Sequence, residues 1–184
     1  MKCTELIIED HAILRRALDI LDGMVTMMEG GLRIEIADVA AILKFLRLFG
    51  GEVHQSMEET ILFPALLRAA PDDSPIHQML SVHAEERALV AGIEGALKFK
   101  KAADFIWASR RLSLLLRNHF NEEDTILSDL AERLFSSEED NAVAAELEKR
   151  AMQGDIHANV SRMEWKYMPQ PQGGELARAQ AARL

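Results

Sequence analysis

The chain has 184 residues, 48% of them hydrophobic and 28% charged, which is the balance of a folded globular protein with room for a sizeable core. Its net charge is −9 and it has no run of lysine and arginine, so a nucleic-acid partner is not expected. The first residues pass from a short apolar triplet directly into charge, and no apolar run is long enough for a membrane span, so we expect neither a secretory leader nor a membrane partner. With the single cysteine Cys3 no internal disulfide can form, and a reducing cytoplasm is the expected location.

Apolar residues recur at helical spacing along almost the whole chain, and no stretch alternates in the manner of a β-strand. The first predicted helix covers about residues 5–28 and ends at the glycine pair 30–31. The second covers about residues 37–69, with bends expected at the glycine pair 50–51 and at Pro64.

A turn separates this first pair of helices from the second pair. The third helix is expected to start with Ser74 as its cap and to run to about residue 100, and the fourth covers about residues 103–134. A short fifth helix begins with the capping box of Ser136 and Glu139. The predicted fold class is all-α: an up-down antiparallel four-helix bundle over residues 1–135. Residues 136–184 form a short additional C-terminal helix and a tail that packs on the bundle or is partly disordered.

One histidine falls on each of the four long predicted helices. These residues are His11, His54, His83 and His119. Each has apolar residues three, four or seven positions away, so we expect the imidazoles to point into the bundle. Two of the histidines are followed one turn later by a glutamate on the same helix face, Glu58 after His54 and Glu123 after His119.

The chain also contains an internal repeat aligned on these histidines. The segment "HQSMEETIL" at 54–62 recurs as "HFNEEDTIL" at 119–127, and "DHAILRRAL" at 10–18 resembles "VHAEERAL" at 82–89. Each copy is therefore a helix with a histidine followed by a helix with His-x-x-x-Glu. Two such hairpins related by an approximate two-fold axis would bring four imidazoles and two carboxylates together.

Two inward glutamates need a partner, because burying an unpaired carboxylate costs several kcal/mol and normally forces it to neutralise. Arg15 and Arg87, each one turn after a histidine, are one candidate pair of partners. A single inward histidine is more often a hydrogen-bonded core residue than a ligand. A pair of dications would satisfy all six polar groups at once, and we favour that hypothesis.

The size of this set indicates the kind of site. Six ligands are too many for one tetrahedral zinc ion. Shared between two metals with both carboxylates bridging, they give each ion two nitrogens and two oxygens. A bridging oxide, hydroxide or water then leaves one position per metal for an external ligand. The donors suit iron, with manganese or zinc as alternatives. Ferritin-like bundles use Glu-x-x-His instead, and the residues three before the four histidines argue against that class: Ile8, Gly51, Leu80 and Leu116.

The sequence resembles the hemerythrin-like, or HHE cation-binding, family over about residues 4–134. The resemblance rests on "EDHAILR" at 9–15, "HQSMEETILFP" at 54–64, "VHAEE" at 82–86 and "HFNEEDTIL" at 119–127. It implies a four-helix bundle with a non-haem di-iron centre, the two irons bridged by an oxide or hydroxide. It also implies a set of metal ligands, with the two glutamates bridging: His11, His54, Glu58, His83, His119 and Glu123.

One departure from the family bears on function. Oxygen-carrying hemerythrins have a fifth histidine one turn from the position of His83, where this chain has Met79 and Arg87. The set of four histidines and two glutamates looks more like the branch with iron–sulfur repair proteins and eukaryotic iron sensors. This argues against reversible oxygen transport, and the cysteine-containing amino-terminal domain of the repair proteins has no counterpart in this sequence.

The leading functional hypothesis is a di-iron protein that binds O2, NO or peroxide for sensing, scavenging or iron handling. An oxidase or peroxidase is the first alternative, disfavoured because no tyrosine lies near the ligands in sequence. The second alternative is a helical interaction module in which metal only stabilises the fold, and the third is a bundle without metal. We expect a metal- and ligand-binding protein rather than an enzyme.

The remaining candidates are assigned smaller roles. We expect Glu59 and Asp124 to be solvated or salt-bridged, with orientation of the ligands as the alternative. Glu86 and Glu122 could join the site only through a local rearrangement. The methionines, Met24 among them, are expected to fill the core, and His77 to lie on the surface. The segment with His157, Met163, Trp165 and Tyr167 either folds back over the bundle or serves a homodimer interface.

Overall fold

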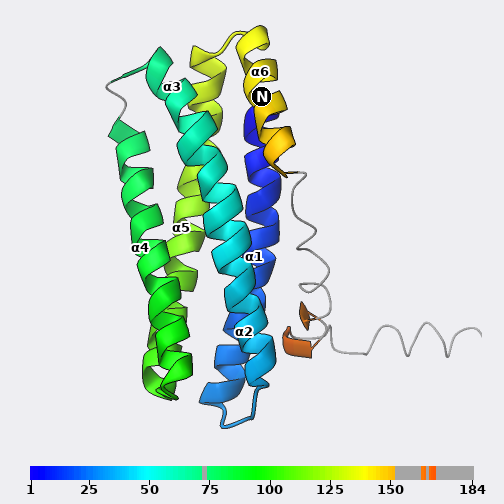
Figure 1. Cartoon of the computed structure of the whole chain (residues 1–184), viewed down its shortest axis with the longest axis vertical. Coiled ribbons are helices and arrows are strands. Elements are labelled where there is room, and N and C mark those ends of the chain that lie inside the picture. The colour runs from blue at the N-terminus through cyan, green and yellow to red at the C-terminus, as the bar shows by residue number, and fades with distance from the viewer. Residues whose placement is uncertain (72–73, 152–162, 165, 169–184) are drawn as a thin grey trace, which may run out of the picture.

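The computed structural model describes residues 1–71, 74–151, 163–164 and 166–168, and within them every regular element is a helix. The elements are α1 Lys2–Glu29, α2 Ile36–Phe45, η1 Leu46–Gln55, η2 Glu58–Leu62, α3 Phe63–Ala69, α4 Ser74–Lys98, α5 Ala102–Leu134 and α6 Ser137–Ala151. Figure 1 shows α1, the column from α2 to α3, α4 and α5 side by side along the long axis, with α6 beside α1. The predicted all-α class is confirmed. None of the described helices is long and apolar enough to cross a membrane.

The ends of the helices follow the local signals in the sequence. After α1, Gly31 adopts a positive φ of 74°, and its N–H donates to the Met28 carbonyl at 3.0 Å. Before α6, the backbone N–H of Ser136 donates to Glu139 Oε2 at 2.8 Å, and the N–H of Glu139 donates to Ser136 Oγ at 3.3 Å. Both predictions are therefore confirmed. The side chain of Ser74, the predicted cap of α4, lies outside the described residues.

The second predicted helix is continuous from residue 36 to 69 but is not α-helical throughout. Its middle consists of two π-helical stretches, η1 and η2, so the expectation of a bent α-helix was incomplete. Gly50 and Gly51 weaken the α-helical ladder inside η1, and Pro64 has no N–H to donate just after η2. Hydrogen bonds of the wider i to i+5 type therefore form instead, and such stretches are frequent at functional sites.

The apolar core is divided into two clusters. One includes Leu14, Phe49, Val90 and Phe120, and the other includes Ile7, Met57, Met79 and Leu127. Along each long helix the residues of one cluster give way to those of the other near the buried histidines and glutamates. The fold thus surrounds one buried polar layer with apolar packing on both sides.

The segment 163–168 packs against the main body. Met163 and Tyr167 are buried in the core cluster that contains Leu14, and the Tyr167 hydroxyl donates to Asp38 Oδ2 at 2.8 Å. These two residues thus lie against the bundle, which is one of the two alternatives that the sequence left open, whereas His157 and Trp165 lie outside the described part of the chain. Met24 fills the core and His77 is exposed, both as predicted.

Candidate metal centre

Six polar side chains from five elements meet in the layer between the two apolar clusters. They are His11 from α1, His54 from η1, Glu58 from η2, His83 from α4, and His119 and Glu123 from α5. Every one of them is at most 4% exposed. The structure therefore brings together all the residues that the sequence repeat predicted to converge.

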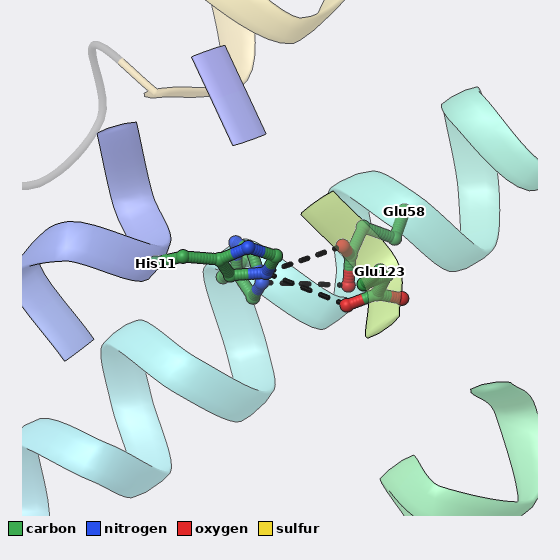
Figure 2. Close-up of side chains that lie close together, drawn as sticks. His11, Glu58 and Glu123 are labelled. Carbon is green, nitrogen blue, oxygen red and sulfur yellow. Dashed lines mark ion pairs between the residues drawn. The ribbon is translucent and has the colours of Figure 1, made fainter. Parts of the chain in front are cut away.

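The Nε2 atoms and carboxylate oxygens of this cluster lie close together, at 3.2 to 3.9 Å, but no hydrogen bond joins them. His11 Nε2 is 3.4 Å from Glu123 Oε2 and 3.9 Å from Glu58 Oε1. Dashed lines in Figure 2 mark ion pairs of His11 with both glutamates. His54 Nε2 and His83 Nε2 lie 3.5 and 3.4 Å from Glu58 Oε2. His119 Nε2 lies 3.2 Å from Glu123 Oε2. All four Nε2 atoms therefore face the two carboxylates.

The buried atoms without a hydrogen-bond partner identify what the cluster lacks. Among the described residues, the orphaned side-chain atoms include all four Nε2 atoms and all four oxygens of Glu58 and Glu123, and the only other one is Ser109 Oγ. Native proteins rarely leave such groups unsatisfied. Two sets of these side chains are close enough to share an ion: His11, His54, Glu58 and Glu123, and His83, His119 and Glu123. Lone-pair donors that converge without a hydrogen bond between them fit metal cations.

The opposite side of the imidazoles is held by carboxylates. His11 Nδ1 lies 2.5 Å from Asp124 Oδ1, and His83 Nδ1 lies 2.9 Å from Glu59 Oε1. An ionised carboxylate only accepts hydrogen bonds, so Nδ1 carries the proton and the lone pair on Nε2 points to the centre. Glu59 and Asp124 follow the two central glutamates directly in sequence. Each therefore orients the histidine of the other hairpin, which is the alternative role that the sequence left open.

Both arginines of the repeat bind these orienting carboxylates. Arg15 Nη2 donates to Asp124 Oδ2 at 2.8 Å, and Arg87 Nη1 donates to Glu59 Oε1 at 2.8 Å. The competing explanation, that arginines neutralise the two central glutamates, is not supported by the described contacts. The described ion pairs of Glu58 and Glu123 are instead all with the four imidazoles.

Comparison with known proteins agrees with this geometry. Residues 3–131, well over half of the chain, match the model of the hemerythrin HHE cation-binding domain. The chain belongs to this family. No curated protein and no solved structure matches the chain. The family description and the geometry of the cluster both indicate a cation site.

The six central residues, called the HHE cluster from here on, have protonation states in the metal-free chain that depend mainly on burial. Burial lowers the pKa of His54 and of His83, and lowers that of His119 to about 4, so these imidazoles are neutral and able to bind a metal. For His11 burial acts in the same direction, but the neighbouring carboxylates of Asp124 and Glu123 outweigh it and the pKa is raised. Burial and the neighbouring charge of Glu123 hold the pKa of Glu58 well above its usual range.

Two residues that sequence reasoning missed complete the surroundings of the HHE cluster. Asp10 Oδ2 lies 3.3 Å from His54 Nδ1 and thus orients a third imidazole. Gln55, adjacent to His54, is buried and donates from Nε2 to Oε2 of the buried Glu86. Their sequence signal was only their position beside a histidine. Glu86 makes no described hydrogen bond or ion pair with the six central residues, and Glu122 is exposed.

Proposed function

We propose that this HHE chain binds two iron ions and uses them to bind a small molecule such as O2, NO or peroxide. The proposed ligands are His11, His54, Glu58, His83, His119 and Glu123, with both glutamates bridging. Residues 1–135 are proposed to form an up-down antiparallel bundle around the ions, and residues 136–184 to pack on it. The contacts of α6 with α1 and η2 support that packing. The proposed location is the cytoplasm.

The single observation that carries the proposal is the set of eight orphaned atoms. Four imidazole nitrogens and four carboxylate oxygens are buried, converge, and have no hydrogen-bond partner among the described residues. One ion cannot take all of them in a tetrahedral site, which supports two ions. Mixed imidazole and carboxylate donors favour iron over magnesium or calcium, with manganese and zinc as the nearest alternatives.

The chain's own residues prepare the centre for an external ligand. Hydrogen bonds to Asp10, Glu59 and Asp124 fix the tautomer and the ring orientation of three imidazoles. The apolar clusters on both sides keep bulk water away from the layer and lower its effective dielectric constant. Iron bound there would supply redox chemistry and an open coordination position. Six protein ligands shared by two ions do not fill two octahedra, which supports binding of an additional small molecule.

A binding role is favoured over an enzymatic one by the position of the single tyrosine. Tyr167 hydrogen-bonds Asp38 and packs in the core cluster of Leu14, so it does not face the centre. The aromatic rings in described contact with the proposed ligands are those of phenylalanines and of the histidines themselves. We therefore propose sensing, scavenging or iron handling rather than substrate oxidation.

The test combines metal content with ligand binding. Elemental analysis of protein purified from iron-supplemented cells should find iron in the wild type and in His77→Ala, an exposed-histidine control, but little in His119→Ala. The reduced iron form is then mixed rapidly with NO or with O2, and the absorbance is followed. New bands would support the proposal. Bound iron with an unchanged spectrum would support the interaction module, and wild-type protein without any metal would refute both.

A further inference from the structure

A cavity of about 290 Å³ opens between η1 and α4, and its position marks a break in the internal repeat. Leu46, Gly51, Val90 and Ala91 line its apolar part. Gly51 lies three residues before His54, and the matching residue of the second repeat, three before His119, is the fully buried Leu116. A Cβ added at Gly51 would meet nothing within 4 Å. The first repeat thus leaves open a space where the second repeat places a leucine.

The inner wall of the cavity also differs from its counterpart. Glu86 lines the cavity three residues after His83, whereas Leu14 stands three residues after His11. Gly50 lies between the two, because a Cβ there would be 3.4 Å from Glu86 Oε1 and 3.5 Å from a methyl group of Leu14. The missing side chain allows the carboxyl of Glu86 to lie against the π-helical backbone.

The same contrast holds for the partner of this carboxyl. Gln55 directly follows His54 and donates to Glu86, whereas the residue that follows His119 is Phe120, which stacks on His11 with ring centroids 4.4 Å apart. The pair of Gln55 and Glu86 is therefore polar, and its member Glu86 lines the cavity. At the matching positions, Phe120 in the second repeat and Leu14 in the first, the chain has only apolar core residues.

We propose that the η1–α4 cavity is the route by which a small neutral molecule such as NO or O2 reaches the metal centre, with Glu86 as its inner gate, held closed by Gln55. This inference rests on the proposed function. Glu86 lines the cavity on one side. On its other side it accepts a hydrogen bond from Gln55, which directly follows His54 in the chain. The outer rim carries the exposed pairs of Arg47 with Glu52 at 2.8 Å and with Glu94 at 3.5 Å. Exposed pairs of this kind break at little cost, so the mouth can open to solvent.

The raised pKa of Glu86 is consistent with such a gate. Burial, the largest cause, raises this pKa to about 8, so the carboxyl is predominantly protonated near neutral pH in the metal-free chain. A neutral carboxyl can rotate away from Gln55 without moving a charge through the apolar layer. In the metal-free chain the gate therefore presents a steric barrier rather than an electrostatic one.

The first test fills the cavity with the side chain that the other repeat contains. Gly51→Leu is compared with Gly95→Leu, since Gly95 is also helical, has no atom within 4 Å of an added Cβ, and does not line this cavity. Stopped-flow mixing of the reduced iron form with NO gives association and dissociation rates. Gly51→Leu should slow both rates about tenfold and leave the dissociation constant unchanged, because a blocked route raises the barrier in both directions. Rates equal to those of Gly95→Leu would overturn the proposal.

The second test addresses the gate. Glu86→Ala removes the barrier and should accelerate NO association several-fold, while Glu86→Gln keeps the shape of the neutral carboxyl and should retain the wild-type rate. An unchanged rate in Glu86→Ala, or equal acceleration in both variants, would refute a steric gate.

The third test separates this inference from the proposed function. Iron content is measured for every variant, and a wild type without iron would contradict the proposed function itself. Crystals of the metal-free wild type and of metal-free Gly51→Leu are pressurised with xenon. We expect xenon between Gly51 and Val90 in the wild type and none in Gly51→Leu. Xenon absent from the wild-type cavity would overturn the access route even if the protein binds iron.

Discussion

The two helices that carry a single central histidine hold it in the same way, whereas the two histidines of the His-x-x-x-Glu motifs are held differently. His11 and His83 each contact a carboxylate through Nδ1, and an arginine one turn along the same helix binds that carboxylate. His54 contacts Asp10, but no described residue hydrogen-bonds Nδ1 of His119. The two repeats therefore share the histidines and glutamates that face the centre. They differ in the residues that contact the outer nitrogens of the imidazoles.

This difference predicts that the two proposed metal positions differ in metal affinity. A carboxylate behind an imidazole raises its basicity and fixes its orientation, so it strengthens metal binding. The position of His11 and His54 has such support on both imidazoles, whereas the position of His83 and His119 has it on one. We expect the first position to bind metal more tightly, and the predictions below test that comparison.

The largest effect should come from the two central glutamates, because both halves share them. Replacing Glu58 or Glu123 by Gln keeps the volume but removes the charge, so iron affinity should fall by more than the roughly 10–100-fold that loss of a supporting partner costs. Glu122→Gln, an exposed neighbour, is the matched control. Elemental analysis measures the loss.

Without metal, the same loss of charge should stabilise the fold instead of weakening a function. Glu58 faces Glu123 in a buried layer where the charged form of its carboxyl is disfavoured, so Glu58→Gln should unfold at a higher temperature than metal-free wild type. Added iron should then stabilise only the wild type. A lower melting temperature for metal-free Glu58→Gln would show that the carboxylate is structural and not held for a metal.

The next largest effect tests the similarity of the two halves. Asp124→Asn and Glu59→Gln should each weaken metal binding by about 10–100-fold, because each removes the carboxylate behind one imidazole. The two losses should match within a few-fold. Titration of the metal-free protein with Fe²⁺ measures them, and Asp129→Asn, an exposed acid on α5, serves as the control. If both variants bind like this control, the carboxylates serve only their arginine salt bridges.

A further prediction concerns the buried acid Glu86. The matching position in the first repeat is Leu14. Burial raises the pKa of Glu86 from 4.5 to about 8, the charge of Glu123 adds to this, and Arg87 opposes it. Between these two pKa values the folded metal-free chain binds a proton that the unfolded chain releases. The stability due to Glu86 is therefore fully present below about pH 4.5 and is lost as the pH rises through about 8.

Chemical denaturation of metal-free protein across this pH window tests the prediction. The free energy of unfolding of Glu86→Gln, relative to wild type, should rise by on the order of 1 kcal/mol per pH unit. The variant cannot ionise at this position, so it escapes the loss. Parallel curves for the two proteins would show that Glu86 titrates as an exposed acid does.

The sequence predicted the helices and the central residues well because both depend on short-range spacing. A histidine at the same phase as leucines must point inward, and two copies of one pattern indicate two equivalent hairpins. Glu59 and Asp124 also repeat in sequence, but their function depends on which helix lies opposite, and spacing does not reveal that. The π-helical turns around His54 depend on competition between hydrogen-bond ladders, which residue periodicity does not resolve.

The remaining residues were hidden for a different reason. Asp10 and Gln55 act across helix interfaces, and neither belongs to a motif that recurs in the second repeat, where Val82 and Phe120 stand instead. A search for repeats finds what the halves share and passes over the positions where they differ. In this protein those positions carry the asymmetry of the centre.

The smallest predicted effects come from two variants that should each reduce the difference in affinity between the two metal positions. Asp10→Asn leaves His54 as unsupported as His119 and should lower affinity at the tighter position by about tenfold. Val82→Asp places a carboxylate at the position that Asp10 has in the first repeat, so it should raise affinity at the weaker position. Calorimetric titration with Fe²⁺ resolves two binding steps when their affinities differ. The two steps should move closer together in either variant, and an unchanged separation in both would show that the difference between the halves has another origin.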